Sequence, residues 1–435
     1  METRPCDSFV ALGDATARGS VLLAKSADTE VNEAEHVVRF EARDYPNGAL
    51  VRITHLNIPQ ARRTHEIILG KSFWSWGAEL GCNEYGVAVG NEAAFSNQSE
   101  DEDGVVVLDL LRLAVERARD AREAVDVIGH HIETYGQGGN CQMMGNYAFD
   151  SGLLVADPNE AYVVNGACRH WAARQVSSVE AISNRYQVRD DWDFSSLELD
   201  NGAKPDFRAL FAEKALETSC GARERENAAQ HILDERRGAI DVGDMADILR
   251  HVGDEDEYEV CYEGTPDKVC MHAAPGEMRE WQATGAMIAD LAAEGPTVWM
   301  TGTSATDLSI FKPLFFGMEL PDMGPAPSGT YTEGALWWTH ERLHRRAMAD
   351  YAALKPEIRA DFDALEAEFF AGAPAVLGQD QAQKRAFVED CWARAAAATD
   401  AWIARLEKRN HYIQNPDYRA VWDRFNREAA FPIHA

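Results

Sequence analysis

The chain has 435 residues, 46% of them hydrophobic and 26% charged, enough to form a sizeable globular core. Its 72 acidic and 42 basic residues give a net charge of −30, which argues against nucleic acids and anionic membranes as partners. The sequence contains no apolar run of about 18 residues and no signal segment, so we expect a cytoplasmic protein. The eight cysteines show neither a CxxC pair nor the spacing of a zinc site.

The predicted elements alternate between blocks of strands and blocks of helices. Short β-rich runs separated by Gly, Pro, Asn and Asp indicate strands over 6–95, and helical periodicity follows over 105–136. A second strand block covers 146–188, helices are expected over 206–250, and a last strand-rich block covers 284–316. From about Leu336 the pattern is helical to the end. Segregated strand and helix runs predict an α+β protein in layers rather than a doubly wound parallel sheet.

A cysteine stands at the start of the first predicted strand, behind the five residues METRP. A small buried residue is the ordinary interpretation of such a cysteine. If residues 1–5 were removed, however, the new α-amine of Cys6 would lie within a few bonds of its sulfur. Because the pKa of an α-amine is about 7.7–8.0, part of it is neutral at pH 7 and can accept the thiol proton. Cys6 would then be a nucleophile with its own base.

Eight ordered blocks carry a family resemblance: CDSFVAL, AKSAD, EHVVRFEA, WSWGAELGCNEYGVAVGNEAAF, TYGQGGNC, LLVADPNEAYVV, AISNRYQV and TGTSATDLSIFKP. In this order they resemble the secernin family, which is related to the cysteine dipeptidases among the N-terminal-nucleophile (Ntn) hydrolases. The resemblance runs from Cys6 to about Phe316. It implies the four-layer αββα Ntn-hydrolase sandwich over residues 6–330, a leader or propeptide over 1–5, and a helical C-terminal extension over 331–435.

The resemblance also implies which residues surround the nucleophile Cys6. Lys25 and Asp28 fall on a basic residue and an aspartate that orient the nucleophile and its amine in this superfamily. The chemistry agrees, because a cation favours a thiolate and a carboxylate holds an ammonium; a surface ion pair is the alternative. Ser26 and Ala27 depart from the family pattern, which removes an asparagine near the nucleophile.

Two asparagines match the positions of oxyanion-hole donors in the superfamily, Asn91 in VGNEAAF and Asn184 in ISNRY. Side-chain amides donate without titrating, although each could equally be a turn or bulge residue. Asn83 in GCNEYG is predicted to form a hairpin turn. GQGGN (136–140) is predicted to cap a helix, with an anion-binding nest as the alternative. His272 in CMHAA is expected to line the substrate pocket or to be a satisfied structural histidine.

These observations predict a thiol-dependent hydrolase of a small amide or peptide, best represented by a dipeptide, with no metal or organic cofactor. An acylase or acyltransferase that uses N-acyl substrates is the alternative on the same fold. A catalytically silent interaction protein is the alternative of another class, because a fold does not determine a function. The sequence leaves open whether the chain forms a homo-oligomer.

Overall fold

The computed structural model describes residues 5–98, 104–253, 268–275, 280–409 and 412–432. Residues 1–4 of the expected leader lie outside this range, as does the acidic segment 254–257. Pro5 is described and buried. Among the helices of the described residues, none combines the length and apolar character needed to span a bilayer.

The first sheet carries Cys6 on its second strand. All its neighbouring strands are antiparallel. In spatial order the sheet consists of β14 (Val179–Ile182), β1 (Cys6–Ala11), β2 (Val21–Glu30), β16 (Trp281–Ala292), β17 (Gly295–Met300) and β18 (Lys312–Leu314). Strands from the first, second and last predicted β blocks therefore meet in one sheet.

The second sheet is also antiparallel throughout. Its strands are, in order, β15 (Phe194–Ser195), β13 (His170–Gln175), β12 (Ala161–Ala167), β11 (Asp150–Ala156), β10 (Ala88–Ala94), β9 (Leu80–Asn83), β8 (Ile67–Ser72) and β3 (Glu35–Phe40). Two small ribbons pair β4 (Arg43–Asp44) with β7 (Arg63–Thr64) and β5 (Leu50–Arg52) with β6 (Asn57–Pro59).

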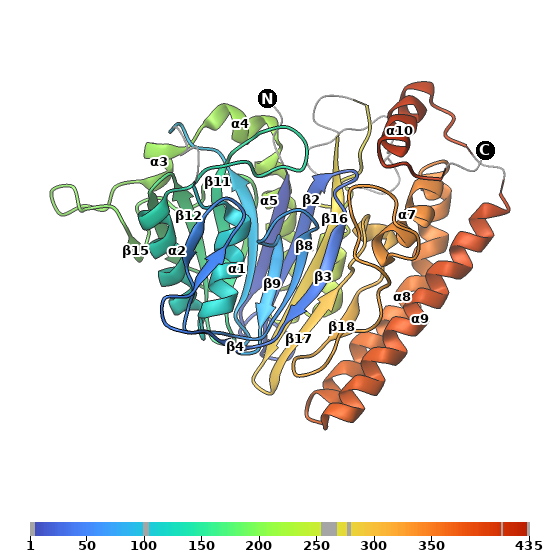
Figure 1. Cartoon of the computed structure of the whole chain (residues 1–435), viewed down its shortest axis with the longest axis horizontal. Coiled ribbons are helices and arrows are strands. Elements are labelled where there is room, and N and C mark those ends of the chain that lie inside the picture. Colours follow the sequence, from blue (N-terminus) through green and yellow to red (C-terminus); the bar gives the residue numbers. More distant parts are fainter. Residues whose placement is uncertain (1–4, 99–103, 254–267, 276–279, 410–411, 433–435) are drawn as a thin grey trace.

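Helices cover the outer faces of both sheets (Figure 1). The second sheet packs against α1 (Val107–Arg117) and α2 (Ala121–Tyr135). The remaining helices are α3 (Phe207–Phe211), α4 (Lys214–Ser219), α5 (Ala222–Arg236), α6 (Val242–Leu249), α7 (Leu336–Ala347), α8 (Tyr351–Leu377), α9 (Gln381–Glu407) and α10 (Pro416–Glu428), with a 3-10 turn η1 (Thr306–Leu308). Of these, α5, α6, α8 and α9 contact the first sheet.

Three hydrophobic cores define the layers. The core between the sheets contains Val10 and Leu23 of the first sheet together with Ile68 and Leu154 of the second. The other two cores lie between each sheet and its helices. The order helix, sheet, sheet, helix confirms the expected four-layer αββα sandwich. The tail helices α7 to α10 share the helix-side core of the first sheet, and α8 and α9 run side by side along one flank (Figure 1).

Local sequence signals explain several boundaries. The helical stretch divides into α1 and α2 at Asp120, whose side chain accepts a hydrogen bond from the Glu123 amide at 2.7 Å and caps α2. Gly136 ends α2 with a φ of 70°, which confirms the predicted cap. Asn83 accepts hydrogen bonds from the amides of Tyr85 and Val87, which confirms its predicted turn role.

Candidate active site

Cys6 is the first residue of β1 and is only 1% exposed. Side chains alternate along a strand, and Ser8 and Val10 of β1 point toward the second sheet; the Cys6 thiol therefore faces the space between the sheets. Cys6 pairs with Ala27 of β2, and its Sγ lies 3.8 Å from the carbonyl oxygen of Asp28. The thiol sits at the end of the sheet where β1 begins.

The backbone nitrogen of Cys6 donates a hydrogen bond to Asn184 Oδ1, at 2.7 Å. Asn184 lies two residues after β14, the neighbouring strand, and is fully buried. The guanidinium of Arg225 also donates to Asn184 Oδ1, and Asn184 Nδ2 donates to the Ala93 carbonyl at 3.0 Å. Because the Cys6 nitrogen and Arg225 can only donate, the oxygen of the Asn184 amide must face them. Asn184 therefore holds the nitrogen of Cys6 through its oxygen, and one of the two N–H groups on its Nδ2 donates to Ala93; its role as an oxyanion donor stays a prediction.

Arg225 of α5 was not predicted from the sequence. Its side chain is completely buried and pairs with the carboxylate of Asp7, 2.9 Å from Nε to Oδ2. It also donates to Ser183 Oγ at 2.8 Å, next to Asn184. A buried charge must be paired and hydrogen-bonded to be tolerated, which both groups achieve here. Arg225 thus supports the acceptor of the Cys6 nitrogen from the helix side of the first sheet.

Lys25 lies near Cys6, as expected. A carboxyl group that was not predicted, that of Glu92, lies beside it. Lys25 is fully buried on β2, and its Nζ lies 4.0 Å from Glu92 Oε1. Burial alone would lower the pKa of Lys25, but the negative charge of Cys6 and Glu92 raises it above its ordinary value. Lys25 therefore supplies a buried positive charge beside the thiol.

Glu92 of β10 reaches across from the second sheet. Its carboxyl group accepts a hydrogen bond from Ser8 Oγ of β1, and burial raises its pKa to about 8, although Lys25 and Ser8 oppose this shift. Gly90, two residues earlier on the same face, is required because a Cβ there would lie 2.3 Å from Ser8 Oγ. The two sheets consequently approach closely at this point, which brings the Lys25 and Glu92 side chains together.

Asp28 lies on the opposite face of β2 from Lys25, because the two residues are three positions apart on a strand. Ser26 Oγ donates to Asp28 Oδ1 at 3.2 Å. Burial and the neighbouring charge of Asp7 raise the pKa of Asp28 to about 8. Lys25 and Asp28 flank the head of β1 from its two faces and do not form the surface ion pair considered as the alternative.

The expectation for Asn91 is corrected by the strand register. Asn91 precedes Glu92 on β10, so its side chain points to the helix side of the second sheet, where Nδ2 donates to the Ala78 carbonyl at 2.8 Å. The structure does not bring Asn91 to Cys6. At this point β10 presents the side chain of Glu92, rather than that of Asn91, to the space between the sheets.

The expectation that His272 lines the substrate pocket is also corrected. Its segment, 268–275, packs into the core on the helix side of the first sheet, whereas the Cys6 thiol faces the other side. His272 Nε2 lies 3.1 Å from Asp307 Oδ2, and both side chains are buried. The imidazole is therefore held by Asp307 of η1 rather than placed beside the nucleophile.

A further buried carboxyl group, that of Glu35, lies between the sheets. Beside it, three residues pair across β1, β2 and β16: Cys6, Ala27 and Gly285. Glu35 of β3 occupies the space that side chains would fill at Gly285 and Gly70, where a Cβ would lie 2.0 Å and 2.2 Å from its carboxylate oxygens. Neither oxygen has a hydrogen-bond partner among the described residues. Burial, with the negative charge of Glu79, raises the Glu35 pKa to about 8. Small residues in the two sheets thus make room for a buried carboxyl group between them.

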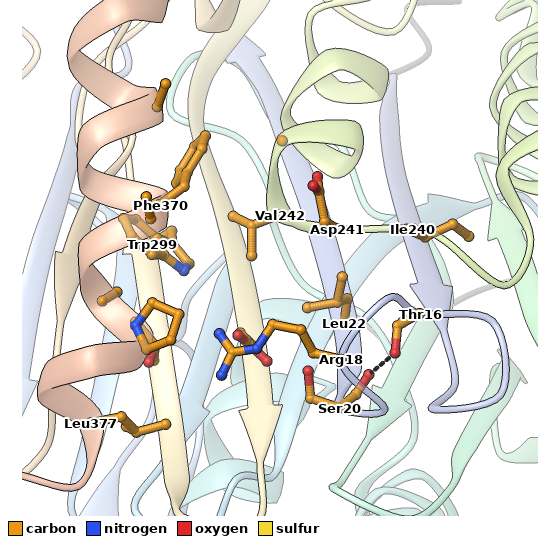
Figure 2. Close-up of a pocket in the computed structure, with 17 residues that line it drawn as sticks. Thr16, Arg18, Ser20, Leu22, Ile240, Asp241, Val242, Trp299, Phe370 and Leu377 are labelled. Atoms are coloured by element: carbon orange, nitrogen blue, oxygen red, sulfur yellow. Dashed lines mark hydrogen bonds between the residues drawn. The ribbon is translucent and has the colours of Figure 1, made fainter.

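A separate cavity of about 480 Å³ lies at the other end of the first sheet (Figure 2). Its lining includes Leu22, Trp299, Phe370 and Arg18. Leu22 is five residues from Ala27 on β2, which corresponds to about 17 Å along the strand. This cavity is therefore distinct from the surroundings of Cys6.

No protein-family model matches the chain. The structure is similar to a conjugated bile acid hydrolase from Clostridium perfringens at 11% identity, covering 72% of this chain and 93% of that one with a TM-score of 0.43. It is also similar to a Caenorhabditis elegans orthologue of N-acylethanolamine-hydrolyzing acid amidase (12% identity, 66% and 93% covered, TM-score 0.37) and to penicillin V acylase from Agrobacterium tumefaciens (11%, 72% and 86%, 0.40). At these TM-scores the likenesses are weak, and the layer assignment rests on the sheets and helices themselves.

Proposed function

We propose that this chain is a thiol-dependent Ntn-hydrolase that cleaves a small amide with Cys6 as its nucleophile. The observation that carries the proposal is the hydrogen bond from the Cys6 nitrogen to Asn184 Oδ1. A buried asparagine, itself oriented by Arg225, is arranged to receive that nitrogen. Such a dedicated acceptor serves a purpose if the nitrogen becomes a free amine that must be held in one orientation.

In the proposed reaction the neutral α-amine of Cys6 accepts the thiol proton, and the thiolate attacks the amide carbonyl carbon. The ammonium then returns this proton to the departing amine, which leaves a thioester on Cys6. The amine next takes a proton from water, whose oxygen attacks the thioester and releases the acid. One N–H of the amine donates to Asn184 Oδ1, so its lone pair remains available for the proton. Lys25 stabilises the thiolate electrostatically.

The amine becomes available only if residues 1–5 are removed. The sulfur of Cys6 can attack the Pro5 carbonyl, which moves the acyl group from nitrogen to sulfur, and water then opens the thioester. This step uses the same thiol and the same nitrogen as the proposed reaction. We therefore infer that the active protein begins at Cys6.

The buried carboxyl groups of Glu35 and Glu92 favour a substrate with a free amino group, of which a dipeptide is the simplest example. Glu92 lies across the inter-sheet space from β1, and the Glu35 carboxyl stands where Gly285, in register with Ala27 and Cys6, leaves room. Burial raises the pKa of both carboxyl groups to about 8, and an ammonium group bound beside them would lower that pKa, favour the ionised form and donate hydrogen bonds to it. In an N-acyl substrate the corresponding nitrogen is acylated and carries no positive charge. The carboxyl groups of Glu35 and Glu92 therefore support a dipeptide over an N-acyl amide.

The test combines mass and activity measurements on the wild type, Cys6→Ala and Cys82→Ser, a matched change at another buried cysteine. We expect wild type and Cys82→Ser to begin at Cys6 and to hydrolyse dipeptides. Cys6→Ala should keep residues 1–5 and lose activity by at least about 10³-fold. Full activity in wild-type protein that retains residues 1–5 would refute the amine as the base.

The substrate class is tested separately by comparing each dipeptide with its N-acetylated form. We expect kcat/KM to fall by at least about 10-fold on acetylation, because the charged group is lost. Preference for the acetylated substrates would overturn the dipeptide assignment and leave the thiol mechanism standing.

A further inference from the structure

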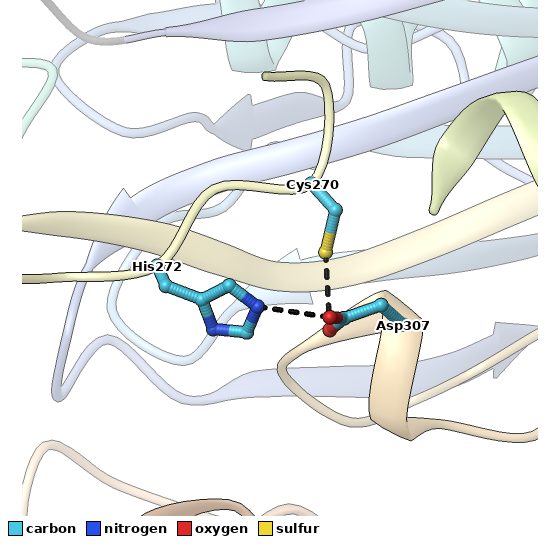
Figure 3. Close-up of side chains that lie close together, drawn as sticks. All are labelled: Cys270, His272 and Asp307. Carbon is cyan, nitrogen blue, oxygen red and sulfur yellow. Dashed lines mark hydrogen bonds and ion pairs between the residues drawn. The ribbon is translucent and has the colours of Figure 1, made fainter. Parts of the chain in front are cut away.

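A second cluster of reactive side chains lies on the helix side of the first sheet and takes no part in the proposed reaction. Cys270 and His272 come from segment 268–275, and Asp307 comes from η1 (Figure 3). All three are buried, and one ligand atom from each lies within 4.8 Å of the others. Thiolate, imidazole and carboxylate are the three side-chain groups that bind zinc in proteins.

Two distances in this cluster, each to a different oxygen of Asp307, are close to those between ligands of one metal ion. Cys270 Sγ lies 3.3 Å from Asp307 Oδ1, and His272 Nε2 lies 3.1 Å from Asp307 Oδ2. With Zn–S near 2.3 Å and Zn–N and Zn–O near 2.0 Å, tetrahedral angles place sulfur and oxygen about 3.5 Å apart and nitrogen and oxygen about 3.3 Å apart. Coordination would require the three ligand atoms, now within 4.8 Å of one another, to close to these distances around one carboxylate oxygen.

A second histidine is positioned to complete the set. His344 of α7 is buried, and its Nδ1 lies 2.9 Å from Glu341 Oε1. Its other nitrogen, Nε2, is buried without a hydrogen-bond partner among the described residues. Metal-binding histidines characteristically direct one ring nitrogen to a carboxylate and the other to the metal.

The distance between the two imidazoles agrees with this role. The ring centroids of His272 and His344 are 5.6 Å apart. Two imidazoles bound to one tetrahedral zinc have centroids about 5 Å apart. The lack of a hydrogen-bond partner for His344 Nε2 among the described residues is thus an observation independent of the three-residue cluster, and its ring lies beside that of His272.

We propose that Cys270, His272, Asp307 and His344 form a structural site for one zinc-like divalent cation. A thiolate ligand favours zinc over magnesium or calcium, which prefer oxygen ligands. Four protein ligands leave no open position, as in structural rather than catalytic zinc sites. The ion would join segment 268–275 and η1 to α7, and so fasten the helical tail to the sandwich. This proposal does not depend on the reaction proposed for Cys6.

The competing arrangement is a hydrogen-bonded network without metal. Tyr351 donates a hydrogen bond to Asp307 Oδ2, and Lys355 interacts electrostatically with the same carboxylate. Tyr351 and Lys355 could satisfy Asp307 by themselves. The experiment must therefore detect a sulfur–metal bond rather than a change in stability alone.

We would strip the full-length, reduced protein with EDTA and titrate it with Co²⁺ or Zn²⁺, using Cys6→Ala as the parent so that the terminal thiol does not contribute. We expect about one equivalent of metal per chain and, with Co²⁺, a thiolate-to-cobalt charge-transfer band and the intense visible bands of a tetrahedral site. Cys270→Ser should abolish the charge-transfer band, whereas Cys82→Ser should retain it. His344→Gln should weaken binding by at least about 10-fold, and His340→Gln on the same helix should not.

Binding of less than about 0.1 equivalent of Zn²⁺ to the folded parent would overturn the proposal and favour the metal-free network. Equal charge-transfer bands in Cys270→Ser and Cys82→Ser would also overturn it, because the sulfur would then belong to another residue. If Cys270→Ser fails to fold, the comparison of His344→Gln with His340→Gln decides the question.

Discussion

The clearest quantitative consequence of the structure concerns the carboxyl of Glu35, which has no hydrogen-bond partner within the described part of the chain. It is enclosed between the sheets where Gly70 and Gly285 leave room, and burial raises its pKa to about 8. In the unfolded chain a glutamate has a pKa of about 4.3. Replacing Glu35 with glutamine removes the titration and keeps the size of the side chain.

The sign of the effect follows from the direction of the pKa shift. Between about pH 4.3 and pH 8 the folded protein keeps a proton on Glu35 that the unfolded chain releases, so the free energy of unfolding falls as pH rises. Each pH unit costs about 1.4 kcal/mol for one proton, so Glu35 lowers stability by about 4 kcal/mol between pH 5 and pH 8. The burial cost of the glutamine amide is the same at both pH values and cancels in the comparison.

Urea unfolding at pH 5 and pH 8 measures this difference for the wild type, Glu35→Gln and Glu41→Gln, whose side chain is 72% exposed in the wild type. Relative to wild type, Glu35→Gln should gain about 4 kcal/mol in unfolding free energy between the two pH values, and Glu41→Gln should follow the wild type. A constant offset between Glu35→Gln and the wild type would show that the Glu35 carboxyl is not protonated in the folded protein.

Three further predictions follow from the site and from the charge. Asn184→Ala should lower kcat for dipeptide hydrolysis by about 10²-fold by releasing the Cys6 amine, and Asn91→Ala should leave kcat nearly unchanged; the reverse pattern would show that Asn184 does not position the amine. Arg225→Met should destabilise the fold by about 3–5 kcal/mol in urea unfolding because Asp7 is left buried and unpaired, and an unchanged midpoint would contradict the buried ion pair. The net charge of −30 predicts a melting temperature that rises between low salt and about 1 M NaCl, so a steady fall would refute self-repulsion as a destabilising term.

Much of the fold was accessible from local sequence patterns. The strand blocks, the helical stretches and the helical tail were predicted from periodicity and turn residues, and the observed layers agree with them. The turn at Asn83 and the cap at Gly136 were predicted for the same reason, because both depend on residues close in sequence.

The site was predictable only in part, and the misses have a common cause. Asn91 and Glu92 are adjacent on β10, and a strand sends adjacent side chains to opposite faces, so a change of one position exchanges the helix side for the inter-sheet side. Arg225 could not be identified because its partners, Asp7 and Asn184, are 218 and 41 residues away. Nothing in ARERENAAQ distinguishes a buried arginine from the exposed arginines of a solvated helix.

The sequence by itself determined that a thiol heads the first strand and that Lys25 lies on the second, since both follow from local strand patterns. Only the tertiary structure decided which face each neighbour presents and which distant groups meet at the Cys6 nitrogen. The same holds for His344 and the pair Cys270 and His272, which come from separate segments. The physical reason is that hydrophobic periodicity is a property of consecutive residues, whereas a buried polar group is stabilised by whichever donor or acceptor the packing of the layers brings within about 3 Å.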